Sequence, residues 1–412
     1  MNGSDSVFVF ICTALVFFMT PALALFYGGM VRSKNVLSTS MHSYAMFAIV
    51  SVQWVAVGYS LAFGNNIGGI IGGFQNAFMN GIGFDPNPLY SATIPASLFF
   101  MFQLMFAIIT PALISGSFAE RIKFSSFLVF ITLWIFLVYD PIAHWVWGDG
   151  GWLRTLGALD FAGGNVVHIS SGVTGLVAAI YLGKRKNRSS AKPHNIPLSI
   201  LGVGILILGW YGFNAGSALG FNAAAMTAFI TTNTAAACGM IGWTAFEWIR
   251  TKKPTALGAV SGAVAGLVAI TPGAGFVSVG GSVAIGLLGG SICYFAVSIM
   301  KKKFGYDDAL DAFGCHGIGG TVGGLAVGLF AWVDKSTLTP AGSNGLFYGG
   351  DFSLLGKQAI AIIVTYALAG IVSFILLKVI DKVMGLRSSA EDEAIGLDIA
   401  DHGEEAYSGI AV

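Results

Sequence analysis

The hydrophobic positions of this chain fall into long runs that are separated by short polar or glycine-rich segments. A run of about 20 apolar residues is long enough to cross the hydrocarbon core of a bilayer as an α-helix. Read at this length, the pattern predicts eleven membrane-spanning helices and therefore an all-α integral membrane protein. Their approximate limits are 7–31, 42–63, 95–118, 124–140, 163–182, 197–217, 223–245, 256–272, 279–300, 309–332 and 353–380.

The composition agrees with this class. Charged residues make up 10% of the 412 residues, whereas about 25% is typical of soluble domains. The chain also has 57 glycines, and small residues let transmembrane helices pack closely. No basic segment precedes the first apolar run, so we expect no cleaved signal peptide. The four cysteines lie within apolar runs without metal-binding spacing, and we expect no metal and no other cofactor.

Basic residues lie almost entirely in alternate loops. The loops expected on one side of the membrane carry 18 of the 21 Lys and Arg residues, and only Arg154, Lys335 and Lys357 lie on the other side. Because cytoplasmic loops are enriched in Lys and Arg, we predict an outer N-terminus and a cytoplasmic C-terminus in the cell membrane. We divide the chain into a transmembrane domain, 1–384, and an acidic cytoplasmic tail, 385–412, which we expect to have a regulatory, docking role.

Two segments in the fifth and tenth predicted helices have the same pattern. His168 follows Asp160 by eight residues in DFAGGNVVHISSG, and His316 follows Asp308 by eight residues in DALDAFGCHGIGG. Because five helices lead from one segment to the other, the two must run in opposite directions. This predicts inverted repeats at about 7–182 and 197–332, with the helix at about 353–380 as an extra element. Eight helical residues carry each His about 12 Å into a core about 30 Å thick, so the two can meet.

A histidine at mid-membrane depth is costly and indicates a functional site. Two neutral imidazoles can share a proton and turn their remaining nitrogen atoms toward a lumen. Packing histidines that bond to backbone carbonyls are the alternative, which the matching positions of His168 and His316 disfavour. We expect Asp160 and Asp308 to cap the starts of their helices, where a carboxylate accepts bonds from free N–H groups. A second role for Asp160, attracting a cation from outside, stays open.

Aromatic residues recur near these segments. Phe102 and Phe106 lie one turn apart on one face of the third predicted helix. An aromatic face can hold a cation with roughly 0.5–2 kcal/mol. A stripe of aromatic residues is more often an ordinary packed core, so the spacing alone does not define a pore. The further aromatic residues of this group are Trp147, Trp210 and Phe213, and the hydroxyl-bearing Ser217 follows Phe213 by one helical turn.

Six motifs of the chain are long and follow one another in a fixed order. They are YGGMVRSKNVLS, AERIKFSS, PIAHWVWGDGGWL, DFAGGNVVHISSG, GWYGFNAGSA and DDALDAFGCHGIGG. They closely resemble those of the ammonium transporter, methylammonium permease and Rhesus family. The resemblance extends from about Leu25 through the GLDIADHGEEAY segment of the tail and is most like a bacterial ammonium transporter. Trp147 favours the ammonium-transporter branch, whereas Asn165 and Asp149 depart from the expected pattern.

The resemblance implies a role for each of ten residues. It implies that His168 and His316 are twin histidines that line a hydrophobic pore. The outer ammonium-recruitment site is expected to comprise Phe102, Trp147 and Ser217, with Asp160 shaping it. The expected phenylalanine gate consists of Phe106 and Phe213, and the other expected pore-lining residues are Tyr27 and Trp210.

The resemblance also implies the assembly and the partners. The family fold is a homotrimer of eleven-helix subunits, each with its own pore. Ammonium or ammonia and methylammonium are the expected transported species, and a PII-type nitrogen-regulatory protein is an expected cytoplasmic partner. Membrane lipid is an expected partner as well, and nucleic acid is not.

These observations lead to a hypothesis of ammonium transport. Ammonium is recruited outside, gives up its proton, and crosses as ammonia past the twin histidines, with or without a separately moved proton. Two alternatives remain: an ammonium sensor with little flux, and a channel for another small neutral solute. We find no phosphate-binding loop, nucleophile elbow or metal-ligand cluster in the sequence, so we do not expect an enzyme.

Overall fold

The computed structural model describes residues 1–186 and 192–407, and these residues are mostly helical. Arg188, one of the basic residues counted above, and the last five residues of the tail lie outside the described residues. The helices in the first half are α1 (Gly3–Met30), α2 (Val36–Gln53), α3 (Tyr59–Phe63), α4 (Ala96–Phe118), α5 (Phe124–Trp134), α6 (Asp140–Trp147), α7 (Trp152–Leu156) and α8 (Ser170–Leu182). Those in the second half are α9 (Ile196–Gly216), α10 (Ala223–Thr251), α11 (Ala256–Ile270), α12 (Val279–Phe295), α13 (Lys301–Phe304), α14 (Ile318–Phe330), α15 (Phe352–Met384), α16 (Ala390–Ile395) and α17 (Leu397–His402).

Short elements interrupt or join these helices. Two strands, β1 (Asn66–Ile67) and β2 (Ile71–Gly72), form a small antiparallel hairpin. The 3-10 turns are η1 (Ser33–Asn35), η3 (Ala77–Met79) and η9 (Leu346–Tyr348). The π-helical turns are η2 (Trp54–Gly58), η4 (Ile135–Tyr139), η5 (Gly164–Ile169), η7 (Ala296–Met300) and η8 (Phe313–Gly317). Such π turns often occur at functional sites.

The all-α membrane class is confirmed. Among the described residues, ten helical segments are long and apolar enough to cross a membrane. They correspond in order to the predicted spans, except at the eighth place, where α11 is an apolar helix of 15 residues. The count of eleven spans and the inverted orientation of the halves stay predictions. The ten segments are Gly3–Met30, Ser33–Phe63, Ala96–Phe118, Phe124–Leu156, Gly164–Leu182, Ile196–Gly216, Ala223–Thr251, Val279–Phe304, Phe313–Phe330 and Phe352–Met384.

The fourth helix is longer than the sequence pattern predicts. The apolar run predicts an end near residue 140, but α5 continues through η4 into α6, to Trp147. Asp140 is fully buried there, and Gln53 of α2 donates a hydrogen bond of 2.7 Å to its carboxyl group. A polar side chain can lie inside a helix bundle when a partner satisfies it, so the helix does not end at Asp140.

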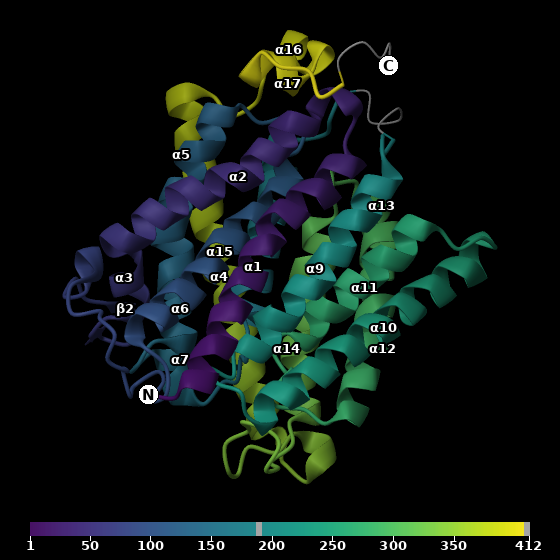
Figure 1. The fold of residues 1–412 in the computed structure, drawn as a ribbon. Helices are drawn as coiled ribbons and strands as arrows, with labels where there is room; N and C mark the ends of the chain where they lie inside the picture. The colour runs from purple at the N-terminus through teal and green to yellow at the C-terminus, as the bar shows by residue number, and fades with distance from the viewer. Residues whose placement is uncertain (187–191, 408–412) are drawn as a thin grey trace.

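The long helices pack side by side in one bundle (Figure 1). α1 packs against α9, and α10 packs against α11 and α12. The N-terminus, beside α7, and the tail helices α16 and α17 lie at opposite ends of the bundle (Figure 1). α4 lies in the interior, since every residue from Phe102 to Phe118 is buried. The elements that contact α4 include α1, α2 and α8.

The two repeated segments cross closely because glycines follow their histidines. Gly172 and Gly320 each lie four residues after a His. A Cβ atom on Gly172 would lie 2.1 Å from the backbone nitrogen of Gly317, and one on Gly320 would lie 3.1 Å from the Cβ of His168. Small residues at a helix interface let backbones approach in membranes. The glycines therefore bring η5 and η8 within side-chain reach of each other.

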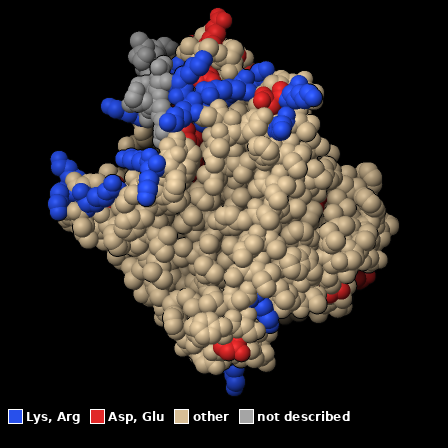
Figure 2. Space-filling view, turned by 180° about the vertical axis from the view of Figure 1, so that it is seen from behind, with Lys and Arg blue, Asp and Glu red and all other residues tan. Residues whose placement is uncertain are grey.

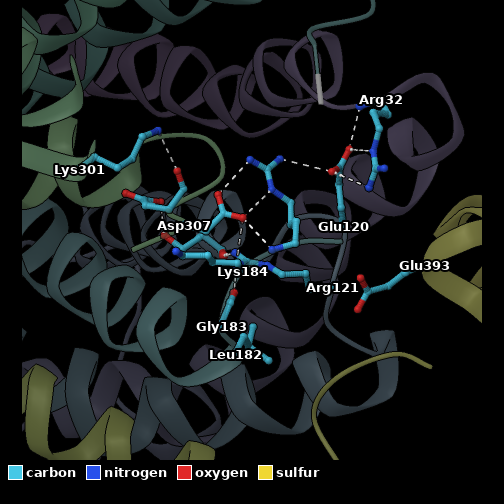
Figure 3. Close-up of polar contacts among 12 residues, drawn as sticks. Arg32, Glu120, Arg121, Leu182, Gly183, Lys184, Lys301, Asp307 and Glu393 are labelled. Atoms are coloured by element: carbon cyan, nitrogen blue, oxygen red, sulfur yellow. Dashed lines mark hydrogen bonds and ion pairs between the residues drawn. The ribbon is translucent and has the colours of Figure 1, made fainter. Parts of the chain in front are cut away.

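Basic side chains gather at the end of the bundle that carries the tail, and few are seen at the opposite end (Figure 2). Within this basic end, two buried carboxylates join four loops (Figure 3). Glu120 pairs with Arg32 at 3.0 Å and with Arg185 at 3.3 Å. Asp307 pairs with Arg185 at 3.1 Å and with Arg121 at 3.8 Å. The network therefore holds together the loops that follow α1, α4, α8 and α13.

The arginines also set the ionisation of this network. Burial would raise the pKa of Glu120, but hydrogen bonds and charge from Arg32 and Arg185 outweigh it and lower that pKa. Burial likewise opposes ionisation of Asp307, but the hydrogen bonds from Arg185 lower its pKa to about 2. Both carboxylates are therefore charged at neutral pH. A buried charge is tolerated only when it is paired and hydrogen-bonded, as here.

The tail packs across the basic end. Arg387 donates hydrogen bonds to the carbonyl oxygens of Leu182 (2.8 Å) and Lys184 (2.9 Å), and it pairs with Glu393 at 2.6 Å. Farther along, a carboxylate oxygen of Asp398 accepts a bond of 2.8 Å from the backbone nitrogen of Ser38, in the first turn of α2. The tail is thereby attached to the end of α8 and to the start of α2.

We predict that Gly172→Ala destabilises the bundle, because the new methyl group meets backbone atoms that cannot rotate away. The loss is about 1–3 kcal/mol, the usual cost of overpacking, and appears as a lower melting temperature of the purified protein in detergent. The matched control is Gly204→Ala in α9, since a Cβ atom there meets nothing within 4 Å. Equal melting temperatures for both variants would contradict the close crossing.

Candidate functional site

Three cavities lie in series through the bundle. The outer cavity, at the end opposite the basic loops, has a volume of about 260 Å³. A small chamber between the two repeated segments follows, with a volume of about 10 Å³, close to the least space that one water molecule requires. The inner cavity has a volume of about 220 Å³. Phe106 lines the outer cavity, Phe213 lines the chamber, and His316 lines both the chamber and the inner cavity.

Two phenylalanine rings separate the outer cavity from the chamber. Phe106 of α4 and Phe213 of α9 have ring centroids 4.2 Å apart, and both side chains are buried. The indole of Trp147 meets Phe106 edge-on at 5.8 Å on the outer side. Phe102 does not line the outer cavity: its ring is fully buried and packs behind Phe106 at 5.0 Å. Phe102 and Phe106 therefore lie on one face of α4, one helical turn apart, and only Phe106 lines the cavity.

The two histidines meet in the chamber. Their Nδ1 atoms are 3.3 Å apart, and their ring centroids are 5.3 Å apart. A neutral imidazole has one donor and one acceptor nitrogen, so one Nδ1 donates and the other accepts. The Nε2 atom of His168 is buried and has no hydrogen-bond partner among the described residues. The ring of His168 also stacks on Trp210 at 5.5 Å, and Trp210 is held by its bond to Thr271 (2.9 Å).

Buried aspartates fix the starts of both repeated segments. Asp160 accepts hydrogen bonds from the backbone nitrogens of Gly163, Gly164 and Asn165 at 2.6–2.8 Å. Asp308 accepts one bond of 2.8 Å from the backbone nitrogen of Phe313 and another from a serine hydroxyl. In both segments a carboxylate oxygen is bonded to the nitrogen five residues ahead. The two aspartates therefore cap the starts of η5 and η8, and the bonded nitrogens of Asn165 and Phe313 lie three residues before each His.

The charge of Asp160 is opposed by its surroundings. Burial raises the pKa of Asp160. The hydrogen bonds that its carboxylate accepts from backbone N–H groups lower this pKa only in part. Asp160 lines the outer cavity, but both carboxylate oxygens are already occupied by backbone donors. Its backbone carbonyl accepts a bond of 2.9 Å from the Trp147 indole. Asp160 therefore shapes the outer cavity without offering a free carboxylate oxygen to a ligand.

Two polar side chains in the outer cavity can accept hydrogen bonds. The hydroxyl of Ser217 donates to the backbone carbonyl of Phe213 at 2.9 Å, which leaves its oxygen lone pairs free to accept. Gln103 lines the same cavity, and its Oε1 atom has no partner among the described residues. The sequence analysis did not single out Gln103. Gln103 lies three residues before Phe106 and therefore on the same helical face, and this spacing could have predicted that it lines the cavity.

The remaining expected residues lie away from the outer cavity. Tyr27 lines the inner cavity, where its hydroxyl donates to the carbonyl of Leu113 at 3.2 Å. Asn165 and Asp149, the two departures from the family pattern, line none of the three cavities. Phe26 and Val264 line both the chamber and the inner cavity, and sequence reasoning missed them. They sit in uniformly apolar runs, where the residue pattern does not indicate the side that faces a cavity.

Replacing Asp160 or Asp308 with Asn is expected to weaken the start of the corresponding segment. An Asn side chain places an NH₂ group where a carboxylate oxygen accepts a backbone bond, so at least one buried donor loses its partner. Each variant should lose about 1–3 kcal/mol of stability, measured as a lower melting temperature in detergent. The control is Asp351→Asn, at the exposed N-cap of α15. The side chain there accepts a bond from the backbone nitrogen of Ser353, and the amide oxygen of Asn can accept the same bond. Unchanged melting of both buried variants would argue against the capping role.

Comparison with known proteins shows the family to which this chain belongs. The model of the Ammonium Transporter Family matches residues 7–407. The ammonium transporter of Bacillus subtilis (strain 168) is 59% identical over 409 residues, covering 99% of each chain. The putative ammonium transporter of Methanothermobacter thermautotrophicus is 48% identical, also covering 99% of each chain.

Solved structures are similar over nearly the whole chain. The crystal structure of Candida albicans Mep2 has a TM-score of 0.89 and 36% identity, covering 99% of this chain and 91% of Mep2. A protein described as a sensor Amt protein has a TM-score of 0.88 and 30% identity, covering 97% of this chain and 98% of its own. The family members compared are transport proteins rather than enzymes. This chain therefore belongs to the ammonium transporter family and is a multi-pass transport protein of the cell membrane.

Proposed function

We propose that this protein is an ammonium channel: ammonium is recruited in the outer cavity and gives its proton to water there, and ammonia passes His168 and His316, with or without a separately moved proton. The observation that carries the proposal is the order of the three cavities. A cavity with polar and aromatic walls leads through a closed pair of phenylalanine rings to an apolar chamber that contains two paired histidines. Family membership supports ammonium as the transported species.

Recruitment rests on aromatic faces and a hydrogen-bond acceptor. The rings of Trp147 and Phe106 border the outer cavity, and an aromatic face attracts a cation by roughly 0.5–2 kcal/mol. Ser217 accepts a hydrogen bond from the ion, and Phe102 supports the Phe106 ring from behind. Potassium has no N–H group to donate. A site that accepts hydrogen bonds from its ligand therefore discriminates in favour of ammonium.

Deprotonation follows from the change in surroundings. Below Phe213 the chamber walls are mostly aliphatic and aromatic, and they include Leu113, Val167 and Leu206. A full charge is expensive inside the membrane when no partner neutralises it. Neutral ammonia carries no such cost and can exchange hydrogen bonds with the histidine pair. Potassium has no proton to release, so the chamber excludes it a second time.

The assembly and the regulation are part of the same proposal. We expect a homotrimer in which every subunit has its own pore, with methylammonium as a second transported species. A PII-type regulatory protein is the expected partner at the basic end, on the cytoplasmic side. The tail bonds to the start of α2 and the end of α8 through Asp398 and Arg387, which supports a regulatory role for that segment.

The function is tested with the purified protein in liposomes, measuring current and internal pH after an ammonium pulse. We expect a signal that saturates with ammonium and is absent with potassium. A current shows that charge crosses, whereas an internal pH rise without current shows a neutral ammonia channel. In the His168→Ala and His316→Ala double variant, the preference for ammonium over potassium should fall by roughly tenfold, equivalent to about 1.4 kcal/mol. His42→Ala, a buried histidine outside the three cavities, is the control.

The main alternative is an ammonium sensor with little flux. The likeness to a protein described as a sensor Amt protein, which covers 97% of this chain, favours keeping this alternative. The liposome measurement separates the two. Folded protein that binds ammonium but gives neither a current nor a pH change would replace the channel with the sensor. Unchanged ion preference in the double histidine variant would instead remove only the proposed role of His168 and His316.

Deleting residues 386–412 is expected to lower ammonium flux by about fivefold, at the lower end of typical coupling between distant sites. The physical reason is the loss of the bonds that attach the tail to α2 and α8. The measurement is initial ammonium uptake per folded protein. Deleting 408–412 alone leaves those bonds in place and serves as the control. Wild-type uptake by the longer deletion would show that the tail does not regulate the pore.

A further inference from the structure

One wall of the outer cavity is a short loop between α7 and η5. We call this loop, residues 157–163, the strap. Four of its residues, 158–161, line the outer cavity. The strap also carries the carbonyl that holds the Trp147 indole and the carboxylate that caps η5, both from Asp160. The position of the strap therefore sets both the recruiting aromatic ring and the start of the segment that carries His168.

The strap is anchored by bonds to residues far away in the sequence. The backbone nitrogen of Phe161 donates to the carbonyl of Pro272 at 3.0 Å. Both backbone groups of Leu159 are bonded to one side chain, that of Gln358 in α15. The nitrogen of Leu159 donates to Oε1 at 2.7 Å, and Nε2 donates to the carbonyl of Leu159 at 2.8 Å. Nε2 also donates to the carbonyl of Gly324 in α14 at 3.1 Å.

A carboxamide suits this position because it offers an acceptor and two donors on one rigid plane. The side chain of Gln358 pairs with Leu159 as a neighbouring strand would, and its remaining donor reaches α14. Gln358 is fully buried, so water cannot replace these bonds if the side chain is removed. A buried backbone group without a partner costs about 1–3 kcal/mol. We therefore expect the strap to shift until the unpaired backbone groups of Leu159 find other hydrogen-bond partners.

We propose that Gln358 is a positioning residue of the outer ammonium site. It does not line the outer cavity, so it acts through the strap: it fixes Leu159, and Leu159 places the adjacent Asp160 against Trp147 and η5. This inference rests on the proposed recruitment of ammonium in the outer cavity. It also makes that site depend on α15, the helix that the sequence analysis leaves outside both repeats.

The test compares Gln358→Met with wild type in ammonium uptake by liposomes. Methionine has nearly the same length but cannot form the three bonds. The ammonium concentration for half-maximal uptake should rise about tenfold, while the maximal rate per folded protein falls less than about twofold. Gln358→Asn keeps the amide but is one methylene too short to bond both partners, and it should raise the same concentration if the Met variant does not fold. An unchanged half-maximal concentration in a folded variant overturns the inference.

A double variant distinguishes positioning from general destabilisation. If Gln358 acts through Trp147, then Gln358→Met in a Trp147→Leu background should raise the half-maximal concentration by less than about twofold. If the two substitutions instead raise the half-maximal concentration independently, so that their separate fold-changes multiply in the double variant, the proposal is overturned. Ser373→Ala removes a buried bond of 2.9 Å between α15 and Thr174, and is the control that should leave this concentration unchanged. Absence of ammonium uptake by wild type would refute the proposed function itself, and is thereby distinguishable from failure of this inference.

Discussion

The structure of the candidate pore depends on two buried aspartates that hold the starts of two helical segments inside the bundle. A backbone that breaks its helix at membrane depth must satisfy its free N–H groups within the protein. Asp160 and Asp308 do this for η5 and η8, and each lies eight residues before a histidine. Glycines four residues after each histidine then allow the segments to approach until the two imidazoles meet. Without those caps and glycines, neither the histidine pair nor the chamber around it would be fixed.

The polarity of the three cavities gives the proposed mechanism its physical basis. The outer cavity combines aromatic rings with hydroxyl and carboxamide groups, and the chamber offers little but carbon atoms and two imidazoles. A cation is stabilised in the first environment and disfavoured in the second. The closed rings of Phe106 and Phe213 mark the change. Ammonium can lose its charge with a proton and enter the chamber as ammonia, whereas a metal ion keeps its charge and cannot enter.

Two different kinds of attachment hold the ends of the bundle. At the basic end, the paired charges of Glu120, Asp307 and three arginines join four loops, and the tail adds further bonds across them. At the outer end, neutral hydrogen bonds with Gln358 and with the carbonyl of Pro272 fix the strap. At the basic end each buried carboxylate is tolerated because arginines pair with it, whereas Gln358 fixes the strap with an amide that carries no charge of its own.

The sequence alone determined the membrane class, most of the spans, the charge asymmetry and the repeated Asp–His spacing, because each follows from local composition or from fixed helical geometry. The equal Asp–His spacing also predicted that His168 and His316 lie at the same depth. Only the tertiary structure decided that α5 continues past Asp140, that Phe102 packs behind Phe106, and that Tyr27 faces the inner cavity. The rotation of an apolar helix about its axis is set by packing, and an apolar pattern does not encode it. Gln358 lies 199 residues from Leu159, and a bond over that separation exists only once the whole bundle has formed.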